Sequence, residues 1–307
     1  MHNVVIIGSG CAGNTAAVYT ARAGLKPLVV KGREAGGQLS ITSEVENFPG
    51  FPEGINGPDL VENMKKQAER FGAVYIDGEV QGADLTKRPF ELNIEGDTIQ
   101  TRTLIVATGA SARWLGLPSE QHFIGKGLSS CATCDGFFHR GKEIIVVGGG
   151  DTAMEEANFL TRFASKVTLV HRKDTFRASK IMLERAKANP KIQFVIDSVV
   201  EEVIGGEHGQ VIAARLKNLV TGEISVHEIT GLFVAIGHIP NTNVFKGQLD
   251  LDKDGYIVSH GGARTNIEGV FHAGDVQDRV YRQAITAAGA GCMAAIEAER
   301  LLEAEGH

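Results

Sequence analysis

The chain has 307 residues, of which 43% are hydrophobic and 22% are charged, and its net charge is −6. This length predicts about two globular domains, and the negative charge lacks the basic footprint that nucleic-acid binding requires. The N-terminal "MHNVVIIGSG" has a short apolar run without a preceding basic segment, and no stretch approaches the ~20 apolar residues of a membrane span. We therefore expect a first strand rather than a signal peptide, and neither a nucleic-acid nor a membrane partner.

Residues 4–32, "VVIIGSGCAGNTAAVYTARAGLKPLVVKG", contain an apolar run, a glycine turn, a helical stretch and a second β-branched run. This order predicts a βαβ unit whose turn carries the G-x-G-x-x-G fingerprint at Gly8, Gly10 and Gly13. The first glycine makes the tight turn, the second admits a pyrophosphate, and the third lets the helix and strand pack closely. The pattern predicts a dinucleotide site.

Of the four cysteines, Cys131 and Cys134 lie close together in "SSCATCDGFF". A secreted disulfide framework is not expected, and we predict a cytoplasmic protein. A zinc site needs four ligands, and no second C-x-x-C or H-x-H cluster accompanies this pair. Simple packing leaves the spacing and the adjacent Asp135 unexplained. A redox-active dithiol is therefore favoured over zinc binding and over packing.

Residues 144–172, "IIVVGGGDTAMEEANFLTRFASKVTLVHR", align without a gap with residues 4–32, at an offset of 140. The fingerprint positions of this second copy are Gly148, Gly150 and Ala153. Both copies follow a predicted strand and open a predicted helix, which is the context that the fingerprint requires. Two dinucleotide sites in one chain suggest one flavin and one nicotinamide.

The residues after each second strand assign the two nucleotides. The second copy ends in "VHRKDTFR", where His171 stands beside the cations Arg172, Lys173 and Arg177, with no acid at the strand end. Cations there suit a 2′-phosphate, so we predict an NADPH site rather than an NADH site; the alternative is a solvated basic turn.

The first copy has Glu34 as its nearest acid, because Lys31 and Gly32 hold the position that is usually acidic. We interpret it as an FAD site of a less typical form. Two later segments support a flavin: "TLIVATGA", a strand that ends in a turn at Gly109, and "GVFHAGDV", a strand followed by Asp275. Asp275 is placed to bind a ribitol hydroxyl; the alternative is that it caps a helix starting near Tyr281.

Taken together, these segments resemble the low-molecular-weight thioredoxin reductases. The motifs that carry the resemblance run from about residue 4 to residue 302 in the family's order: "GSGCAGNTAA", "GGQLSITSEVENFPG", "ATGASARWLGLPSE", "CATCDGFF", "GGGDTAMEEA", "HRKDTFRA", "GLFVAIGHIPN", "GVFHAGDV" and "YRQAITAAGAGCMAA". The C-A-T-C-D pentapeptide is the most specific of them.

The resemblance implies an α/β fold of two Rossmann-like, three-layer nucleotide-binding domains. An FAD domain would comprise residues 1–113 and 242–307, and an NADPH domain, residues 114–241, would be inserted through a two-stranded hinge and carry the C-x-x-C. The resemblance also implies a homodimer.

It further implies a set of cofactor contacts. The FAD contacts would be Gly8, Gly10, Gly13, Gln38, Asn47, Asp275, Arg282, Gln283 and Ala284. The NADPH contacts would be Gly148, Gly150, His171, Arg172 and Arg177. Lys173 stands where a second arginine is common; lysine keeps the charge but loses the planar bidentate fork. Asp151, at the mouth of the second glycine turn, is expected to be a modest electrostatic cost near phosphates.

The resemblance implies a flavoprotein disulfide reductase that passes electrons from NADPH through FAD and the Cys131–Cys134 dithiol to the disulfide of thioredoxin. Cys134 would lie next to the flavin, Cys131 would attack thioredoxin, and Asp135 would be the general acid and base. Two alternatives stay open. A ferredoxin-dependent thioredoxin reductase would lack the basic cluster that follows the second copy, and a flavin-linked dithiol oxidase or redox sensor would use another dithiol.

Overall fold

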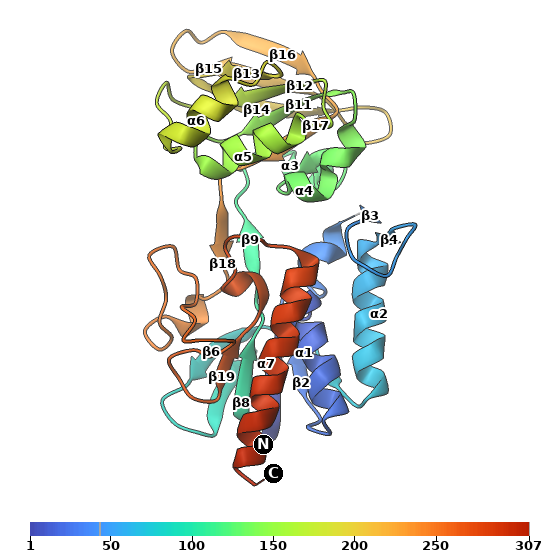
Figure 1. Ribbon diagram of the computed structural model, residues 1–307, viewed down its shortest axis with the longest axis vertical. Helices are drawn as coiled ribbons and strands as arrows, with labels where there is room; N and C mark the ends of the chain where they lie inside the picture. The colour runs from blue at the N-terminus through green and yellow to red at the C-terminus, as the bar shows by residue number, and fades with distance from the viewer. Residues whose placement is uncertain (43, 307) are drawn as a thin grey trace. The chain divides into compact units, whose positions relative to one another are not determined.

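The computed structural model of the protein describes residues 1–42 and 44–306, which divide into two compact units. Unit 1 comprises Met1–Ser111 and Ile239–His307, and unit 2 comprises Ala112–His238. Unit 1 is built on a mixed sheet with a parallel centre, and unit 2 on a parallel sheet (Figure 1). The predicted fold class, α/β with two Rossmann-like domains, is confirmed. Within the described ranges no helix is long and apolar enough to cross a membrane.

The helical elements of unit 1 come from both of its chain segments, and the last of them is the longest. Its helical elements are α1 (Cys11–Arg22), η1 (Gly37–Ile41), α2 (Gly57–Arg70), η3 (Asn243–Phe245), η4 (Gly274–Val276) and α7 (Ala284–Ala304). Its strands are β1 (His2–Ile7), β2 (Leu28–Val30), β3 (Glu44–Val45), β4 (Ile55–Asn56), β5 (Val74–Ile76), β6 (Val80–Asp84), β7 (Phe90–Ile94), β8 (Asp97–Val106) and β19 (Val270–His272).

The main sheet of unit 1 has the order β5-β2-β1-β8-β7-β6, with β19 also pairing with β8. The pairs of β1 with β2 and β8, of β2 with β5, and of β19 with β8 are parallel. Val4 and Ile6 of β1 pack with α1 and α7 residues on one face, whereas Val5 and Ile7 pack in a second core on the other. Burial on both faces explains why β1 is a continuous apolar run rather than an alternating one.

The C-terminal part of unit 1 is joined to its N-terminal part through the same sheet and through a helix pair. Val270 of β19 lies opposite Leu104 of β8, and α7, red in Figure 1, runs beside the blue α1. The two helices approach closely because α7 carries a glycine at the crossing: a Cβ on Gly291 would overlap the carbonyl oxygen of Ala12.

Unit 2 has a five-stranded parallel sheet and a separate antiparallel one. Its helical elements are α3 (Glu120–Phe123), α4 (Ala132–Asp135), η2 (Gly136–His139), α5 (Asp151–Leu160) and α6 (Lys180–Lys187). Its strands are β10 (Leu128–Ser129), β11 (Glu143–Val147), β12 (Lys166–Val170), β13 (Ile192–Val195), β14 (Ser198–Gly205), β15 (Val211–Asn218), β16 (Ile224–Glu228) and β17 (Gly231–Val234).

The parallel sheet of unit 2 has the order β10-β17-β11-β12-β13 and is covered on both faces. Ile144 and Val146 of β11 pack against residues of α5 and α6 on one face. Ile145 and Val147 pack on the other face with side chains of β14 and β15, which pair with β16 in a three-stranded antiparallel sheet. The result is a three-layer unit.

The chain passes between the units twice, and the two passages carry β9 (Ala110–Ala112) and β18 (His238–Pro240), which form a two-stranded sheet. On the unit 1 side, Thr108 Oγ1 donates to Asn241 O at 2.8 Å, and Asn241 Nδ2 donates back to Thr108 O at 2.9 Å. On the unit 2 side, Arg113 N donates to Gly237 O at 2.9 Å. Each end of the connection is therefore fastened within its own unit.

Candidate active site

The two glycine turns have the same backbone construction. Gly8 N donates to Val30 O at 2.8 Å in unit 1, and Gly148 N donates to Val170 O at 3.1 Å in unit 2. A Cβ on Gly8 would overlap the carbonyl oxygen of Ala107, and a Cβ on Gly148 would overlap that of Ala235. In both copies, then, the first glycine is required because the neighbouring parallel strand leaves no room for a side chain.

The third position differs between the copies. A Cβ on Gly13 would overlap the carbonyl oxygen of Gly8, so α1 approaches the turn too closely for alanine. In unit 2 the equivalent Ala153 is fully buried, with its Cβ 2.6 Å from where a Cβ on Gly148 would lie. The difference between G-x-G-x-x-G and G-x-G-x-x-A thus reflects how closely each helix packs against its own turn.

No packing contact within the protein requires a glycine at the second position of each turn. This second glycine is therefore the best indication of a ligand. Nothing lies within 4 Å of a Cβ on Gly150, and the nearest atom to a Cβ on Gly10 is Gly36 O at 3.8 Å. Both residues have extended backbone angles that any residue adopts, and neither α1 nor α5 has a side-chain cap at its N-terminus. Open space in front of an uncapped helix suits a pyrophosphate.

Several predicted FAD residues of unit 1 come together although they are far apart in sequence. Asn47 Nδ2 donates to Gln283 Oε1 at 3.4 Å across 236 residues. Gln283 is the N-cap of α7 and forms a capping box with Thr286, which puts Ala284 in the first turn. Gln38 lies on η1, where its carbonyl oxygen accepts a hydrogen bond from Thr42 Oγ1 at 3.0 Å.

Asp275 lies on η4, just past the carboxyl end of β19. Its Oδ1 is buried and has no hydrogen-bond partner among the described residues. Burial and the nearby Asp278 raise the pKa of Asp275 to about 6, and Arg282 partly opposes the rise. A hydroxyl donor would satisfy this oxygen, which fits the ribitol contact expected of FAD.

The alternative role for Asp275, as a helix cap, is wrong. The helix begins at Ala284 rather than near Tyr281, and its cap is Gln283. The turn before it is held by Asp278, whose Oδ1 accepts hydrogen bonds from Val280 N and Tyr281 N at 2.9 Å each. Arg282 follows with a positive φ of 48°.

The other predicted residues of the flavin site lie around the turn of unit 1. Lys31, which holds the usual acidic position, pairs with Asp77 at 2.9 Å, so its charge is matched within the unit. Glu34 is exposed, and its carbonyl oxygen accepts a hydrogen bond from Gly37 N at 2.9 Å. Gly109 has a positive φ of 66° and accepts a hydrogen bond from Asn241 N at 3.0 Å.

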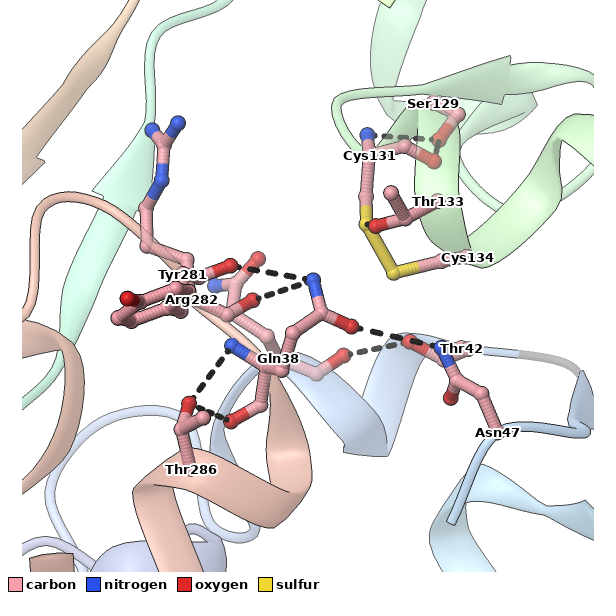
Figure 2. The surroundings of a disulfide bond; sticks show 11 residues. Gln38, Thr42, Asn47, Ser129, Cys131, Thr133, Cys134, Tyr281, Arg282 and Thr286 are labelled. Carbon is pink, nitrogen blue, oxygen red and sulfur yellow. Dashed lines mark hydrogen bonds between the residues drawn. A yellow bond between two sulfur atoms is a disulfide. The ribbon is translucent and has the colours of Figure 1, made fainter. Parts of the chain in front are cut away.

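In unit 2, Cys131 and Cys134 form a disulfide with a Cα–Cα distance of 5.3 Å (Figure 2). Cys131 is the N-cap of α4, and its carbonyl oxygen accepts hydrogen bonds from Cys134 N at 3.3 Å and Asp135 N at 3.2 Å. Both cysteines are half-buried. The single turn of α4 therefore closes the C-x-x-C and keeps the sulfurs within reach of a partner.

Asp135 ends α4. Burial raises the pKa of its carboxyl, and a hydrogen bond with the Ser129 side chain opposes that rise. A half-buried carboxyl with a raised pKa beside a disulfide is suited to proton transfer. Ser129 was not among the predicted site residues. Its position two residues before the first cysteine was the available signal, because serine side chains commonly bond backbone two residues away.

The predicted NADPH residues of unit 2 surround the second glycine turn. His171 directly follows β12 and is buried; its Nε2 lies 3.1 Å from Thr175 O, and its ring stacks on Phe176. Burial lowers the pKa of His171, and the neighbouring cations lower it further. A Cβ on Gly149 would overlap the His171 ring, so this middle glycine is needed for packing.

The cations lie on the same segment. Arg172, Lys173 and Arg177 are exposed, and Arg177 N donates to Gly149 O at 2.8 Å, which ties the segment to the turn. The expected electrostatic cost of Asp151 has a structural explanation: its Oδ1 accepts a hydrogen bond from Ser179 N at 2.7 Å, just before α6. Asp151 therefore positions the basic segment against the turn.

Two glycine turns that suit dinucleotides, together with a half-exposed disulfide, define a nucleotide-dependent dithiol–disulfide oxidoreductase. The comparisons agree. Residues 2–291 match the family described as pyridine nucleotide-disulphide oxidoreductase. A thioredoxin reductase of Streptomyces coelicolor is 57% identical over 310 residues, covering 99% of this chain and 95% of that protein. One from Rickettsia felis is 52% identical over 302 residues, covering 97% of each.

Solved structures are also similar. A thioredoxin reductase from Streptococcus pyogenes matches with a TM-score of 0.94 and 40% identity, covering 99% of each chain. One from Giardia duodenalis matches with a TM-score of 0.91 and 43% identity, covering 98% of each. The chain belongs to the pyridine nucleotide-disulphide oxidoreductase family and, within it, to the thioredoxin reductases.

Proposed function

We propose that this chain reduces the disulfide of thioredoxin with NADPH, using FAD and the Cys131–Cys134 dithiol. The observation that carries the proposal is the half-buried Cys131–Cys134 disulfide, which lies in the same unit as an open glycine turn flanked by cations. Relatives named thioredoxin reductase that match nearly the full chain support it. None of the relatives reported above is named as a ferredoxin-dependent reductase or a dithiol oxidase.

FAD is assigned to residues 1–113 and 242–307, and NADPH to residues 114–241. The first assignment is supported by the open space at Gly10 and the unpartnered oxygen of Asp275. Asn47, Arg282 and Gln283 would complete the FAD site, together with the remaining residues implied by the resemblance. The NADPH assignment is supported by the open space at Gly150 and by exposed cations that suit a 2′-phosphate.

When bound, NADPH supplies a hydride and FAD carries the resulting two electrons. This chain's contribution begins at the disulfide: the Cys131–Cys134 bond breaks, and with two electrons and two protons the sulfurs become a dithiol. One proton originates with the hydride and the other comes from solvent. Asp135 transfers a proton at the Cys134 sulfur, and the raised pKa of its carboxyl, caused by burial, favours that role.

The dithiol then passes its electrons on by thiol–disulfide exchange. The Cys131 thiolate attacks one sulfur of the thioredoxin disulfide, forming a mixed disulfide and releasing the other thioredoxin sulfur as a thiolate. Cys134 next attacks the Cys131 sulfur. That step restores the Cys131–Cys134 bond, and the second thioredoxin sulfur leaves and takes up a proton. The family resemblance is the basis for assigning the attack on thioredoxin to Cys131 and the position next to the flavin to Cys134.

The surface beside the disulfide supports a macromolecular partner. Phe137 and Phe138 follow Asp135 by two and three residues and are 47% and 43% exposed. Arg140 lies over the Phe137 ring, with its guanidinium 5.1 Å from the centroid. Exposed aromatic and arginine side chains are typical of protein-binding surfaces, and a small disulfide would not need them.

The deciding experiment is an anaerobic titration of the purified protein with NADPH, NADH and reduced ferredoxin separately, followed by oxidised thioredoxin. NADPH should bleach the flavin absorbance, and thioredoxin should restore it. If NADPH leaves the flavin oxidised while ferredoxin reduces it, the ferredoxin-dependent alternative replaces this proposal. If NADPH bleaches the flavin absorbance but thioredoxin does not restore it, the result supports the dithiol oxidase alternative instead.

We also propose that the protein is a cytoplasmic homodimer. Apolar side chains exposed on α1 and α7 support an association: Tyr19 is 41% exposed, Ile285 46% and Met293 50%. Cys11 and Cys292 are free thiols, which suits a reducing compartment. Sedimentation equilibrium with a Met293→Glu variant tests the dimer, since a charge at the interface should shift the protein to the monomer.

A further inference from the structure

A buried asparagine contacts the first glycine turn from within unit 1. Asn14 lies on α1, directly after Gly13, and is fully buried. Its Nδ2 donates hydrogen bonds to Ser9 O at 2.8 Å and to Val61 O at 3.5 Å. Its Oδ1 accepts a hydrogen bond from the hydroxyl of Tyr75, on β5, at 2.7 Å. The amide of Asn14 therefore joins the turn to a distant strand.

The direction of these hydrogen bonds follows from the groups involved. Ser9 O and Val61 O are carbonyl oxygens, which only accept, so both need the NH₂ group of Asn14. The amide oxygen of Asn14 then faces Tyr75, whose hydroxyl must be the donor. Burial raises the pKa of Tyr75, so its hydroxyl keeps that proton. The bond from Tyr75 holds the Asn14 amide in the orientation that presents its NH₂ group to Ser9.

The bond to Ser9 O fixes the peptide group that joins Ser9 to Gly10. This peptide is trans, so its carbonyl oxygen and its N–H point in opposite directions. Because the Ser9 carbonyl points to the buried Asn14, the Gly10 N–H points away from Asn14. Gly10 is the N-cap of α1, where the side of its Cβ is open. A backbone donor at such a helix end suits an anion.

The second glycine turn has a donor at the same carbonyl, but from a different source. Gly149 is the counterpart of Ser9 at the offset of 140 residues, and its carbonyl oxygen accepts a hydrogen bond from Arg177 N at 2.8 Å. The counterpart of Asn14 is Met154, whose side chain has no hydrogen to donate. Both turns therefore have this carbonyl hydrogen-bonded although the donors differ. The bond belongs to the construction of the turn rather than to the packing of one unit.

The Ser9 side chain extends the network to the segment that faces the turn. Ser9 is 5% exposed, and its Oγ donates to Lys31 O at 3.2 Å and accepts from Gly36 N at 3.0 Å. Gly36 directly precedes η1, which carries the predicted FAD residue Gln38. Gly36 O is also the atom nearest to a Cβ on Gly10, at 3.8 Å. Ser9 therefore holds the turn and the segment opposite it together.

We propose that Asn14 and Tyr75 are positioning residues of the FAD site. Asn14 orients the Ser9–Gly10 peptide so that its N–H is presented to the pyrophosphate, and Tyr75 holds the Asn14 amide in place. The inference rests on the proposed function, in which unit 1 binds FAD. Each residue acts through the group that it bonds, so neither needs to touch FAD. Because the peptide is oriented before FAD binds, binding does not have to order it.

The test applies two measurements to the FAD-loaded protein. Dilution, followed by the fluorescence of released FAD, gives the dissociation constant, and the phosphorus NMR spectrum of bound FAD reports the surroundings of its pyrophosphate. Tyr75→Phe keeps the ring and removes the hydroxyl. It should raise the dissociation constant about tenfold, the equivalent of one hydrogen bond, and shift the pyrophosphate resonances. Asn14→Leu should raise the dissociation constant at least as much.

Thr20→Val is the matched control, because the Thr20 hydroxyl also bonds to α1 but lies away from the turn. Thr20 is fully buried, and its Oγ1 donates to Ala16 O at 2.7 Å. This variant should lower the melting temperature without changing either FAD measurement. In Asn14→Leu protein, a further Tyr75→Phe change should leave the dissociation constant where it is, because Tyr75 acts through Asn14.

An unchanged dissociation constant or an unchanged phosphorus spectrum in Tyr75→Phe would overturn the inference. Equal changes in Thr20→Val, or additive effects in the double variant, would overturn it too. Circular dichroism checks folding; if Asn14→Leu does not fold, the comparison of Tyr75→Phe with Thr20→Val decides. Both measurements need neither NADPH nor thioredoxin. A wild-type protein that binds FAD but does not turn over would therefore refute the proposed function and leave this comparison intact.

Discussion

His272 provides a pH-dependent test of how unit 1 is packed. It ends β19, is 4% exposed, and neither ring nitrogen has a hydrogen-bond partner among the described residues. Burial lowers the pKa of His272 from 6.5 to about 4, and Glu297 opposes this in part. Between these two pH values the unfolded chain binds a proton that the folded chain does not. Stability is therefore lost as pH falls from 6.5 toward 4.

The magnitude follows from the width of that interval. It spans about 2.5 pH units, and one unit corresponds to about 1.4 kcal/mol. The neutral form of His272 in the folded chain therefore lowers the free energy of unfolding by roughly 3 kcal/mol between pH 6.5 and pH 4. Asp275 has the opposite sign. Its pKa rises from 3.8 to about 6, so the folded chain binds the extra proton, and roughly 3 kcal/mol is regained as pH falls from 6 to 3.8. In FAD-free protein the two effects should nearly cancel.

Single variants separate the two effects. In FAD-free protein, urea unfolding of unit 1 at pH 7 and pH 4.5 should show His272→Leu gaining at least about 2 kcal/mol over the wild type at the lower pH. Asp275→Asn should lose a similar amount relative to the wild type over the same interval. If the difference between His272→Leu and the wild type is the same at both pH values, the imidazole is not buried in a neutral form and the reasoning fails.

Four further variants test the two sites. Cys131→Ser should reduce thioredoxin turnover below about 1% of wild type while NADPH still bleaches the flavin, because the attacking thiolate is gone; surviving turnover would contradict the sulfur roles. Arg172→Ala should raise KM for NADPH about tenfold and leave KM for NADH unchanged, since it removes a charge-assisted contact to the 2′-phosphate; an equal rise for both nucleotides would argue against that contact. Gly13→Ala should lower bound FAD and the melting temperature markedly, because its Cβ overlaps Gly8 O, whereas Ala153→Gly should cost about 1 kcal/mol.

Much of the candidate site could be predicted because its signals are local. The glycine at Gly8 and its counterpart at Gly148 recur at an offset of 140 residues, and the structure gives both turns the same strand contact. A tight turn before a helix needs particular residues at particular spacings, so it leaves a mark in any single sequence. The pairing of Cys131 with Cys134 is likewise a matter of one helical turn.

Contacts between distant segments could not be predicted in this way. Asn47 and Gln283 meet across 236 residues, and the cap of α7 proved to be Gln283 rather than Asp275. The hydrogen bond from Ser179 N to the Asp151 carboxylate also joins segments that lie 28 residues apart. In each case the partner of a polar side chain depends on which segments pack together, and that is a property of the whole chain.

The sequence by itself therefore determined the two nucleotide fingerprints, the redox pair and the basic segment, because each depends on residues a few positions apart. Only the tertiary structure decided that β19 and α7 join the first βαβ unit, since their partners β8 and α1 lie more than 160 residues earlier. It also decided that Asp275, just past the carboxyl end of β19, has a buried carboxylate oxygen without a hydrogen-bond partner among the described residues. The proton affinity of a buried carboxyl depends on what surrounds it in space, and no spacing in the sequence records that.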